Sequence, residues 1–451
     1  MNDKKDKKTK INRRGFIQSS LAVCAGLTLT ERGRLIGEYA DNLTRESVVE
    51  IPRIKEFWTL GRTGFKASDI GFGAGNLTNP EILEAALDMG INYIDTGEHY
   101  TRGNSERAIG KVIRNRDRKS LFITTKLNFS LGKTDKEGLK QRFLRCLERL
   151  QTDYADCLMI HLAPSVEQLK HEAYHQATRE LRAEGKVKYT GLSNHGTENR
   201  FAGNTIDDME KVVLAAAEDG RFDVVLFVYN FIQKEKGERI LKVLREKKMG
   251  ATLMKTNPVR VYLRREEYVN RAKEAGREIP EIAWKILEEN KRHVEKAEDF
   301  KKKYGLTSFN EIDDAAIKFV LSHPYVHSAC LTIDTFEELE SFVTLSGKKL
   351  ESTERDMLAD YESVYGRYYC RHACGQCEPY CPHSVPVNTI MRYYHYFSAQ
   401  RREKYAMEKY NSLSRTNAIV CSSCAGYCES ACPYSVHIQG LLILAHQTLT
   451  L

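Results

Sequence analysis

Eight short apolar runs, each followed by a segment with helical periodicity, dominate the 451-residue chain. Helices are predicted between the runs, for example over residues 79–89 and 136–150. Eight strand–helix units in about 290 residues predict an α/β fold of the (β/α)8 TIM barrel type. The alternative is an open doubly wound sheet, but no glycine-rich dinucleotide-binding turn follows the first run. The predicted strands cover residues 68–74, 92–95, 121–127, 154–161, 188–193, 223–229, 250–255 and 327–333.

Polar residues of a few chemical types stand at the ends of three successive predicted strands. Asp95 ends the second strand and Tyr100 follows in the next loop, while Lys126 ends the third strand and His161 ends the fourth. In a barrel of this type the active site lies at the C-terminal ends of the strands. One such residue alone would be structural, but the four together predict an active site on the rim of the barrel.

Two further runs match a known family. A Leu-Gly-Arg-Thr-Gly run stands at residues 60–64, and Gly-Leu-Ser-Asn at residues 191–194 ends the fifth strand. With the four polar residues, these runs make residues 58–349 similar to the aldo-keto reductases. The resemblance implies a barrel domain over about residues 54–350 that acts as an oxidoreductase on a small carbonyl or alcohol substrate.

The resemblance assigns the family's catalytic tetrad to Asp95, Tyr100, Lys126 and His161. A phenol is a weak acid at neutral pH, and a nearby ammonium group favours its ionised form. We therefore expect Lys126 to lower the pKa of Tyr100, with Asp95 holding and balancing the lysine. Tyr100 would then act as the general acid and base, while His161 orients the carbonyl oxygen.

The resemblance also implies contacts with a nicotinamide cofactor. Ser193, Asn194 and Tyr229 match such contacts, and Lys255 stands where the family stacks an aromatic ring on the nicotinamide. After the eighth strand, the family's phosphate clamp is replaced by an acidic stretch at residues 334–338. Acidic groups repel phosphates, so NADP(H) stays open as a cofactor and the sequence argues against its ordinary use.

Eight of the twelve cysteines form two runs past residue 350, and each run ends in Cys-Pro. The pattern resembles ferredoxins with two [4Fe–4S] clusters, in which the fourth cysteine of each run ligates the other cluster. Structural zinc, held by four thiolates at each site, is the alternative. We predict a small, mainly helical ferredoxin-type iron–sulfur domain over residues 351–451, with a helical hairpin over residues 389–410. The predicted ligands are Cys370, Cys374, Cys377 and Cys432 for one cluster, and Cys421, Cys424, Cys428 and Cys381 for the other.

The first 45 residues read as a signal and tether. A lysine-rich start is followed by Arg13-Arg14 before Phe16 and a modestly apolar run, which resembles a twin-arginine (Tat) export signal. A basic tail and a membrane anchor are the alternatives, and lipidation at Cys24 stays open. Because Tat machinery exports folded proteins, the signal agrees with cofactors assembled before export. The predicted location is periplasmic, with membrane association left open.

The remaining observations bound the partners. The formal net charge is +8, of which residues 1–25 carry seven Lys or Arg and two Asp or Glu, so the rest carries only +3. A nucleic-acid-binding face is not indicated.

A charged helical insertion is expected over about residues 258–310. The sequence thus predicts an exported oxidoreductase whose clusters relay electrons to a redox partner protein. The alternative is an electron-transfer or ligand-binding protein whose barrel no longer uses NADP(H).

Overall fold

The computed structural model describes residues 51–195, 207–259, 297–308, 310–400, 402–413 and 416–450, with scattered positions between 274 and 288. The predicted export signal and most of the predicted insertion lie outside the described residues. From Pro52 onward the described residues belong to one compact unit. No helix among the described residues has the length and apolar character needed to cross a lipid bilayer.

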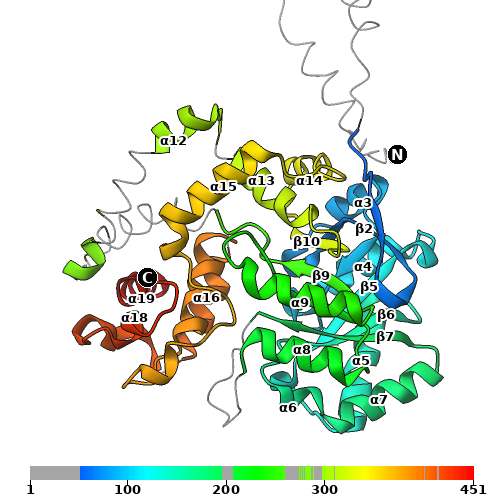
Figure 1. Cartoon of the computed structure of the whole chain (residues 1–451). Coiled ribbons are helices and arrows are strands. Elements are labelled where there is room, and N and C mark those ends of the chain that lie inside the picture. Colours follow the sequence, from blue (N-terminus) through cyan, green and yellow to red (C-terminus); the bar gives the residue numbers. More distant parts are fainter. Residues whose placement is uncertain are drawn as a thin grey trace, which may run out of the picture. The chain divides into compact units, whose positions relative to one another are not determined.

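Eight parallel strands close into a barrel, as the sequence predicts. Each observed strand overlaps one predicted strand, with ends that differ by at most two residues (Figure 1). The strand order around the barrel is β10-β3-β4-β5-β6-β7-β8-β9, so β10 closes onto β3. The strands are β3 (Ile70–Gly73), β4 (Tyr93–Asp95), β5 (Phe122–Leu127), β6 (Ala155–Ile160), β7 (Val187–Asn194), β8 (Val224–Val228), β9 (Gly250–Met254) and β10 (Ser328–Thr332).

Helices cover the outer face of the barrel (Figure 1). Their N-termini are defined locally: Asn79, Asp135 and Asp208 each accept a hydrogen bond from a backbone N–H of the following turn, which satisfies a group that the helix itself leaves unpaired. The barrel helices are α3 (Pro80–Asp88), α4 (Asn104–Ile113), α5 (Lys136–Leu150), α6 (Val166–Leu169), α7 (Glu172–Ala183), α8 (Met209–Asp219), α9 (Lys234–Glu246), α13 (Asn310–Leu321) and α14 (Phe336–Val343).

A hairpin of β1 (Phe57–Thr59) and β2 (Lys66–Ser68) precedes the barrel. Its Leu60 and Ala67 are fully buried and pack with Tyr93, Phe122 and other side chains that point into the barrel. The hairpin therefore extends the barrel interior at the end away from the C-terminal strand ends.

The region beyond the barrel is mainly helical and has its own apolar core. The two helices α16 and α17 match the predicted hairpin over residues 389–410 and pack with α19. Their aromatic and aliphatic side chains surround both cysteine runs. The helices described outside the barrel are α12 (Ala297–Tyr304), α15 (Ser352–Tyr365), α16 (Val387–Ser398), α17 (Glu403–Asn411), α18 (Tyr427–Ser430) and α19 (Ile438–Leu449).

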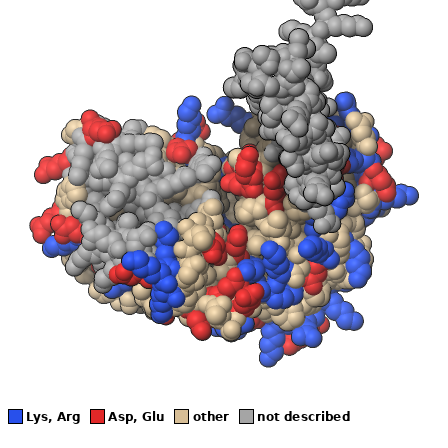
Figure 2. Space-filling model, turned by 90° about the horizontal axis from the view of Figure 1, so that it is seen from above, with Lys and Arg blue, Asp and Glu red and all other residues tan. Residues whose placement is uncertain are grey.

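Lys and Arg side chains alternate with Asp and Glu on the surface (Figure 2). On the face shown, the described residues form no broad patch of a single sign.

Candidate active site

The structure brings Asp95, Tyr100 and Lys126 together inside the mouth of the barrel. The Lys126 ammonium is fully buried and donates to Asp95 Oδ1 at 2.5 Å and to the carbonyl oxygen of Thr96 at 2.6 Å. Its Nζ also lies 3.4 Å from the Tyr100 hydroxyl. The three residues meet because Asp95 ends β4 and Lys126 lies on β5, the neighbouring parallel strand.

His161 follows β6 and completes the predicted set. Its ring stacks on His99 with centroids 4.8 Å apart and meets the Tyr100 ring edge-on at 5.6 Å. Its Nδ1 is buried and has no hydrogen-bond partner among the described residues. Burial, followed by His99 and Lys126, holds the pKa of His161 well below its ordinary 6.5. The imidazole is therefore neutral and can hydrogen-bond a substrate oxygen.

The net electrostatic effect on Tyr100 differs from the prediction. Burial raises the pKa of Tyr100 above its ordinary value, and the Lys126 ammonium opposes the rise without cancelling it. The expectation of a lowered pKa is thus wrong for the net shift, although the lysine acts in the expected direction. Burial alone would lower the pKa of Lys126, because it favours the neutral amine. The charges of Asp95 and Tyr100 outweigh burial, so the pKa of Lys126 is raised. At neutral pH this arrangement holds a protonated phenol beside an ammonium group.

Two buried ion pairs support the loop that carries Tyr100. Glu98 accepts from Arg142 of α5 and from the backbone N–H of Asn128. Glu106 is fully buried, where it accepts from Arg149 at 2.6 Å and from the Thr125 hydroxyl at 2.6 Å. Such partners fix the loop against the neighbouring strand, so Tyr100 has a defined position.

Strain is present next to Tyr100. Thr101 and Arg102 adopt left-handed backbone conformations with φ of 47° and 57°. Non-glycine residues rarely adopt this conformation, and they do so preferentially at functional sites.

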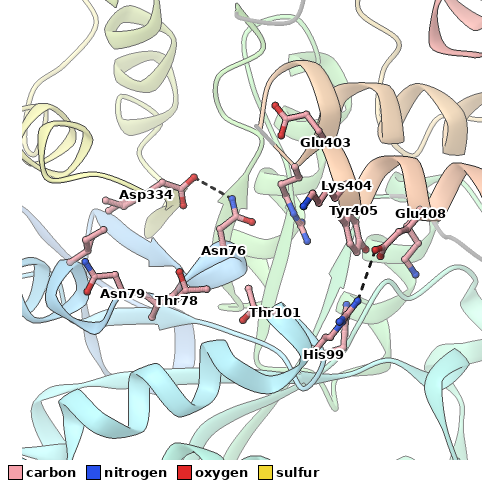
Figure 3. Close-up of a pocket in the computed structure, with 16 residues that line it drawn as sticks. Asn76, Thr78, Asn79, His99, Thr101, Asp334, Glu403, Lys404, Tyr405 and Glu408 are labelled. Carbon is pink, nitrogen blue, oxygen red and sulfur yellow. Dashed lines mark hydrogen bonds and ion pairs between the residues drawn. The ribbon is translucent and has the colours of Figure 1, made fainter. Parts of the chain in front are cut away.

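An open pocket of about 770 Å³ leads to this group of residues (Figure 3). Its walls come from the loop after β3, the loop after β4, Ile333 and Asp334 after β10, and residues 402–409 of the C-terminal region. Figure 3 shows Asn76, which donates to Asp334 at 3.2 Å, across the pocket from His99. His99, which lines this pocket, stacks on His161, so the pocket lies one side chain away from the catalytic candidates.

The match to the Aldo/keto reductase family covers residues 69–361, about two thirds of the chain. The chain belongs to the aldo/keto reductase family. The match ends before Cys370, so the cysteine runs lie outside the part that defines the family.

The matches to individual curated relatives cover smaller shares of this chain than the family match does. The aldo-keto reductase YhdN of Bacillus subtilis is 28% identical over 204 residues, which is 38% of this chain and 61% of that protein. The uncharacterized oxidoreductase YqkF of the same organism is 32% identical over 148 residues, 30% of this chain and 47% of that protein. The chain thus spans about half the length of these curated relatives. The aldo-keto reductase AKR11C1 from Bacillus halodurans in its holo form aligns over 68% of this chain and 95% of that chain, with 21% identity and a TM-score of 0.49.

Three of the four predicted nicotinamide contacts of this aldo/keto reductase barrel lie at its mouth. Ser193 and Asn194 end β7, where Ser193 accepts from the Leu162 N–H and Asn194 donates to the Ala163 carbonyl. Lys255 follows β9. Tyr229 lies apart from them: its ring packs in the outer helix layer, and its hydroxyl donates to Glu238 of α9.

Helix α16 covers the side of the aldo/keto reductase barrel on which the nicotinamide contacts were predicted. The sequence did not predict that this helix lies there. Arg392 of α16 is fully buried and donates to the carbonyl oxygen of His195 at 3.3 Å. Gln233 exchanges two hydrogen bonds with the backbone of His372, both at 2.9 Å. These contacts hold the cysteine-containing region against the C-terminal ends of β7 and β8.

The space left on this side does not fit NADP(H). The pocket beside Lys255 measures about 140 Å³ and is walled by His395, Ala399 and Gln400 of the C-terminal region. Small-molecule pockets usually offer roughly 300 to 1,000 Å³. Asp334 and Glu338 also line it, and their charge disfavours phosphates.

The cysteines lie in the two groups that the ferredoxin resemblance implies. Cys370, Cys374, Cys377 and Cys432 line one small cavity with apolar walls, and this set is called the first cysteine group. Burial, followed by Cys377, Cys374 and Cys432, raises the pKa of Cys370. Burial, followed by Cys428, Cys381 and Cys424, raises the pKa of Cys421 to about 12. The second cysteine group is Cys421, Cys424, Cys428 and Cys381.

The two runs also share a local structure. Glu378 and Glu429 each follow a third cysteine and accept from the backbone N–H of Asn388 and Gln439, at 2.8 and 2.9 Å. After each fourth cysteine a serine takes a left-handed conformation, with φ of 52° and 50°. This repetition places one helix, α16 or α19, after each run.

The donor set suits an iron–sulfur cluster. All eight cysteines are free thiols in the structure. Among the described residues, no three Cys, His, Asp or Glu side chains are close enough to hold a single metal ion. Four thiolates around one apolar cavity are the ligands of a [4Fe–4S] cluster, which is larger than one ion and holds its ligands farther apart. The first cysteine group therefore has the donor set and the cavity that one such cluster requires, and the second group offers the same number of thiols.

Proposed function

We propose that this chain is an exported iron–sulfur oxidoreductase that interconverts a carbonyl and an alcohol at the barrel mouth. The observation that carries the proposal is the meeting of Tyr100, Lys126, Asp95 and His161 beside a pocket of about 770 Å³. Family membership supports an oxidoreductase that acts on small carbonyl or alcohol substrates.

In the reducing direction, Tyr100 is the general acid. Its hydroxyl and the neutral His161 ring both hydrogen-bond the carbonyl oxygen, and the oxygen takes the phenolic proton as charge develops on it. Lys126, 3.4 Å away, stabilises the resulting phenolate, and Asp95 balances Lys126. Solvent then reprotonates Tyr100. In the oxidising direction the phenolate removes the alcohol proton.

The reaction consumes two electrons and two protons for each carbonyl reduced. One proton reaches the oxygen from Tyr100, and a second proton from solvent reaches the carbon once both electrons have arrived. Clusters held by the two cysteine groups would supply these electrons one at a time, and a redox partner protein would reduce the clusters again. Cys370, Cys374, Cys377 and Cys432 would hold one of them, and Cys421, Cys424, Cys428 and Cys381 the other.

The test is turnover by the anaerobic, cluster-containing protein. The clusters are first reduced with dithionite, and their reoxidation by a panel of aldehydes, ketones and oxo acids is followed by visible absorbance and EPR. Replacing Tyr100 with Phe should abolish carbonyl-dependent reoxidation and leave the cluster signals unchanged. Tyr154→Phe removes a hydroxyl far from the mouth and is the matched control. Full turnover in Tyr100→Phe would overturn the proposal.

A second candidate function is an electron-transfer or ligand-binding protein with an aldo/keto reductase barrel that does not use NADP(H). The small, acid-lined pocket beside Lys255 favours it. Carbonyl-dependent reoxidation of the clusters separates the two candidates. Anaerobic titration with NADPH and NADH tests the poor fit of the nucleotide, with binding followed by fluorescence and cluster reduction by EPR. Saturable binding of either nucleotide would contradict the poor fit. No binding and no turnover of any carbonyl would favour the second candidate.

Export to the periplasm belongs to the proposal. It is supported by Arg13-Arg14 and the short apolar run that follows. Replacing both arginines with lysines should keep the protein in the cytoplasm with its clusters intact. Periplasmic recovery of that variant would contradict a Tat signal.

A further inference from the structure

Three cations converge where the C-terminal region covers the barrel mouth. Lys255 follows β9, Arg392 lies in α16, and Arg402 precedes α17. The Tyr396 ring lies between two of them, since Lys255 Nζ is 4.5 Å and the Arg402 guanidinium 5.5 Å from its centroid. The charge of Arg392 also acts on Lys255. We call Lys255, Arg392 and Arg402 the cationic site.

Buried imidazoles border the cationic site. His195 and His395 are 8% and 5% exposed, and the Nδ1 atom of each is buried with no hydrogen-bond partner among the described residues. Buried polar atoms normally have a partner, so each of these calls for an explanation. A ligand that reaches this space would supply one.

In the described part of the chain Lys255 forms no ion pair, although the carboxylates of Asp334 and Glu338 line the same pocket. Its Nζ contacts the Tyr396 ring, and the charges that act on it are those of Arg392 and Arg402. Burial, followed by these two cations, holds the pKa of Lys255 well below its ordinary value. The backbone at Lys255 is also left-handed, with φ of 53°, as is common at functional sites.

The cationic site adjoins the tetrad. Arg402 lines the 770 Å³ pocket together with His99, which stacks on His161. Lys255 lines the smaller pocket on the other side together with His395. The two pockets share Asp334, so a ligand that spans both of them would lie between Arg402 and Lys255.

We propose that Lys255, Arg392 and Arg402 bind the carboxylate of the substrate, so that the protein acts on hydroxy and oxo acids rather than on neutral carbonyls. This inference rests on the proposed function, since it names the substrate class of that site. A carboxylate is small enough for the space beside Lys255 and can accept from several cationic donors at once.

Binding is measured separately from turnover. The cluster-containing protein is titrated by calorimetry with 2-oxobutanoate, its neutral counterpart 2-butanone, and inorganic phosphate. We expect saturable binding of 2-oxobutanoate, at least tenfold weaker binding of 2-butanone, and no competition by phosphate. Lys255→Met should weaken 2-oxobutanoate binding about ten- to a hundredfold, as for loss of a charged hydrogen bond. Lys255→Arg should recover most of it, and the exposed Lys119→Met is the control.

The outcomes separate this inference from the proposed function. Carboxylate binding that depends on Lys255, without turnover of any acid, would support the site and contradict the proposed reaction. Turnover of neutral carbonyls that Lys255→Met leaves unchanged would overturn the cationic site and keep the reaction. Tighter binding of phosphate or ADP than of 2-oxobutanoate would overturn the carboxylate assignment in favour of a nucleotide.

Discussion

Two lysines at the barrel mouth, Lys126 and Lys255, show opposite ways of holding a cation inside a protein. Lys126 is fully buried and lies 2.5 Å from Asp95. Lys255 is partly buried beside Arg392 and Arg402, with no acidic partner among the described residues. The pKa of Lys126 is raised above its ordinary value, and that of Lys255 is lowered well below it.

This difference between the two lysines indicates which of the two sites gains stability from a bound anion. The Lys126 pair is neutral overall and needs nothing from a ligand to be stable. The cationic site carries charge that burial penalises, so an anion improves its free energy. We therefore expect an anion-binding site to resemble the cationic site. A site that only holds a catalytic group in place should resemble the Lys126 pair. Four experiments test this contrast.

The largest expected effect comes from the first cysteine group. Cys432→Ser should remove one cluster and lower the iron content from about eight to roughly four atoms per chain. Asn388 of α16 contacts Cys370 and the backbone of Arg371, so the change should also loosen α16 and abolish binding of 2-oxobutanoate. Iron analysis, EPR and calorimetry measure this. The same EPR signal should be lost in Cys370→Ser but not in Cys381→Ser; the reverse would contradict the grouping.

Asp95→Asn should have the next largest effect. It leaves the buried Lys126 ammonium without its carboxylate, which costs about 3 to 5 kcal/mol of stability. Urea unfolding of the cluster-containing protein, followed by circular dichroism, measures the loss. Asp153→Asn, at an exposed position, is the control and should change stability by less than about 0.5 kcal/mol. A loss no larger than the control would mean that Asp95 and Lys126 are not a coupled buried pair.

Lys255→Met should stabilise the ligand-free protein, by about 1 kcal/mol, because it removes a poorly compensated charge. Lys126→Met should do the opposite, since it leaves the Asp95 carboxylate buried and unpaired. The two unfolding midpoints in urea, without added anion, test the contrast directly. Destabilisation by both changes would show that Lys255 has an acidic partner after all.

The smallest expected effect is a difference in pH dependence. The folded pKa of Lys255 lies below 10.5, so the unfolded chain binds more protons in that range and Lys255 lets stability rise with pH up to 10.5. The folded pKa of Lys126 lies above 10.5, so its stabilisation is present below 10.5 and is lost only as pH rises through the folded value. Unfolding at about pH 7.5 and about pH 9.5 should therefore show a smaller gain in Lys255→Met than in the unchanged protein. Equal gains in stability for the two proteins would mean that the pKa of Lys255 is not lowered.

Local sequence patterns determined most of the barrel. The strand positions, the helix starts at Asn79 and Asp135, and the Asp95, Lys126 and His161 strand ends follow from periodicity and capping within a few residues. Parallel strand ends meet at one edge, so predicting the strands also predicted that these side chains would be neighbours. The two cysteine groups were predicted from the resemblance to ferredoxins with two clusters, in which the fourth cysteine of each run ligates the other cluster.

Only the tertiary structure decided what lies over the barrel mouth. Arg392 and His395 come close to Lys255 because α16 packs on strand ends more than a hundred residues away, and no spacing in the sequence records that contact. The same holds for Tyr229, whose motif predicted a nicotinamide contact but whose ring packs against α13. The net pKa shift of Tyr100 was opposite to the prediction for a related reason. The sequence identifies the nearby lysine, whereas the extent to which Tyr100 is buried depends on every element packed around its side chain.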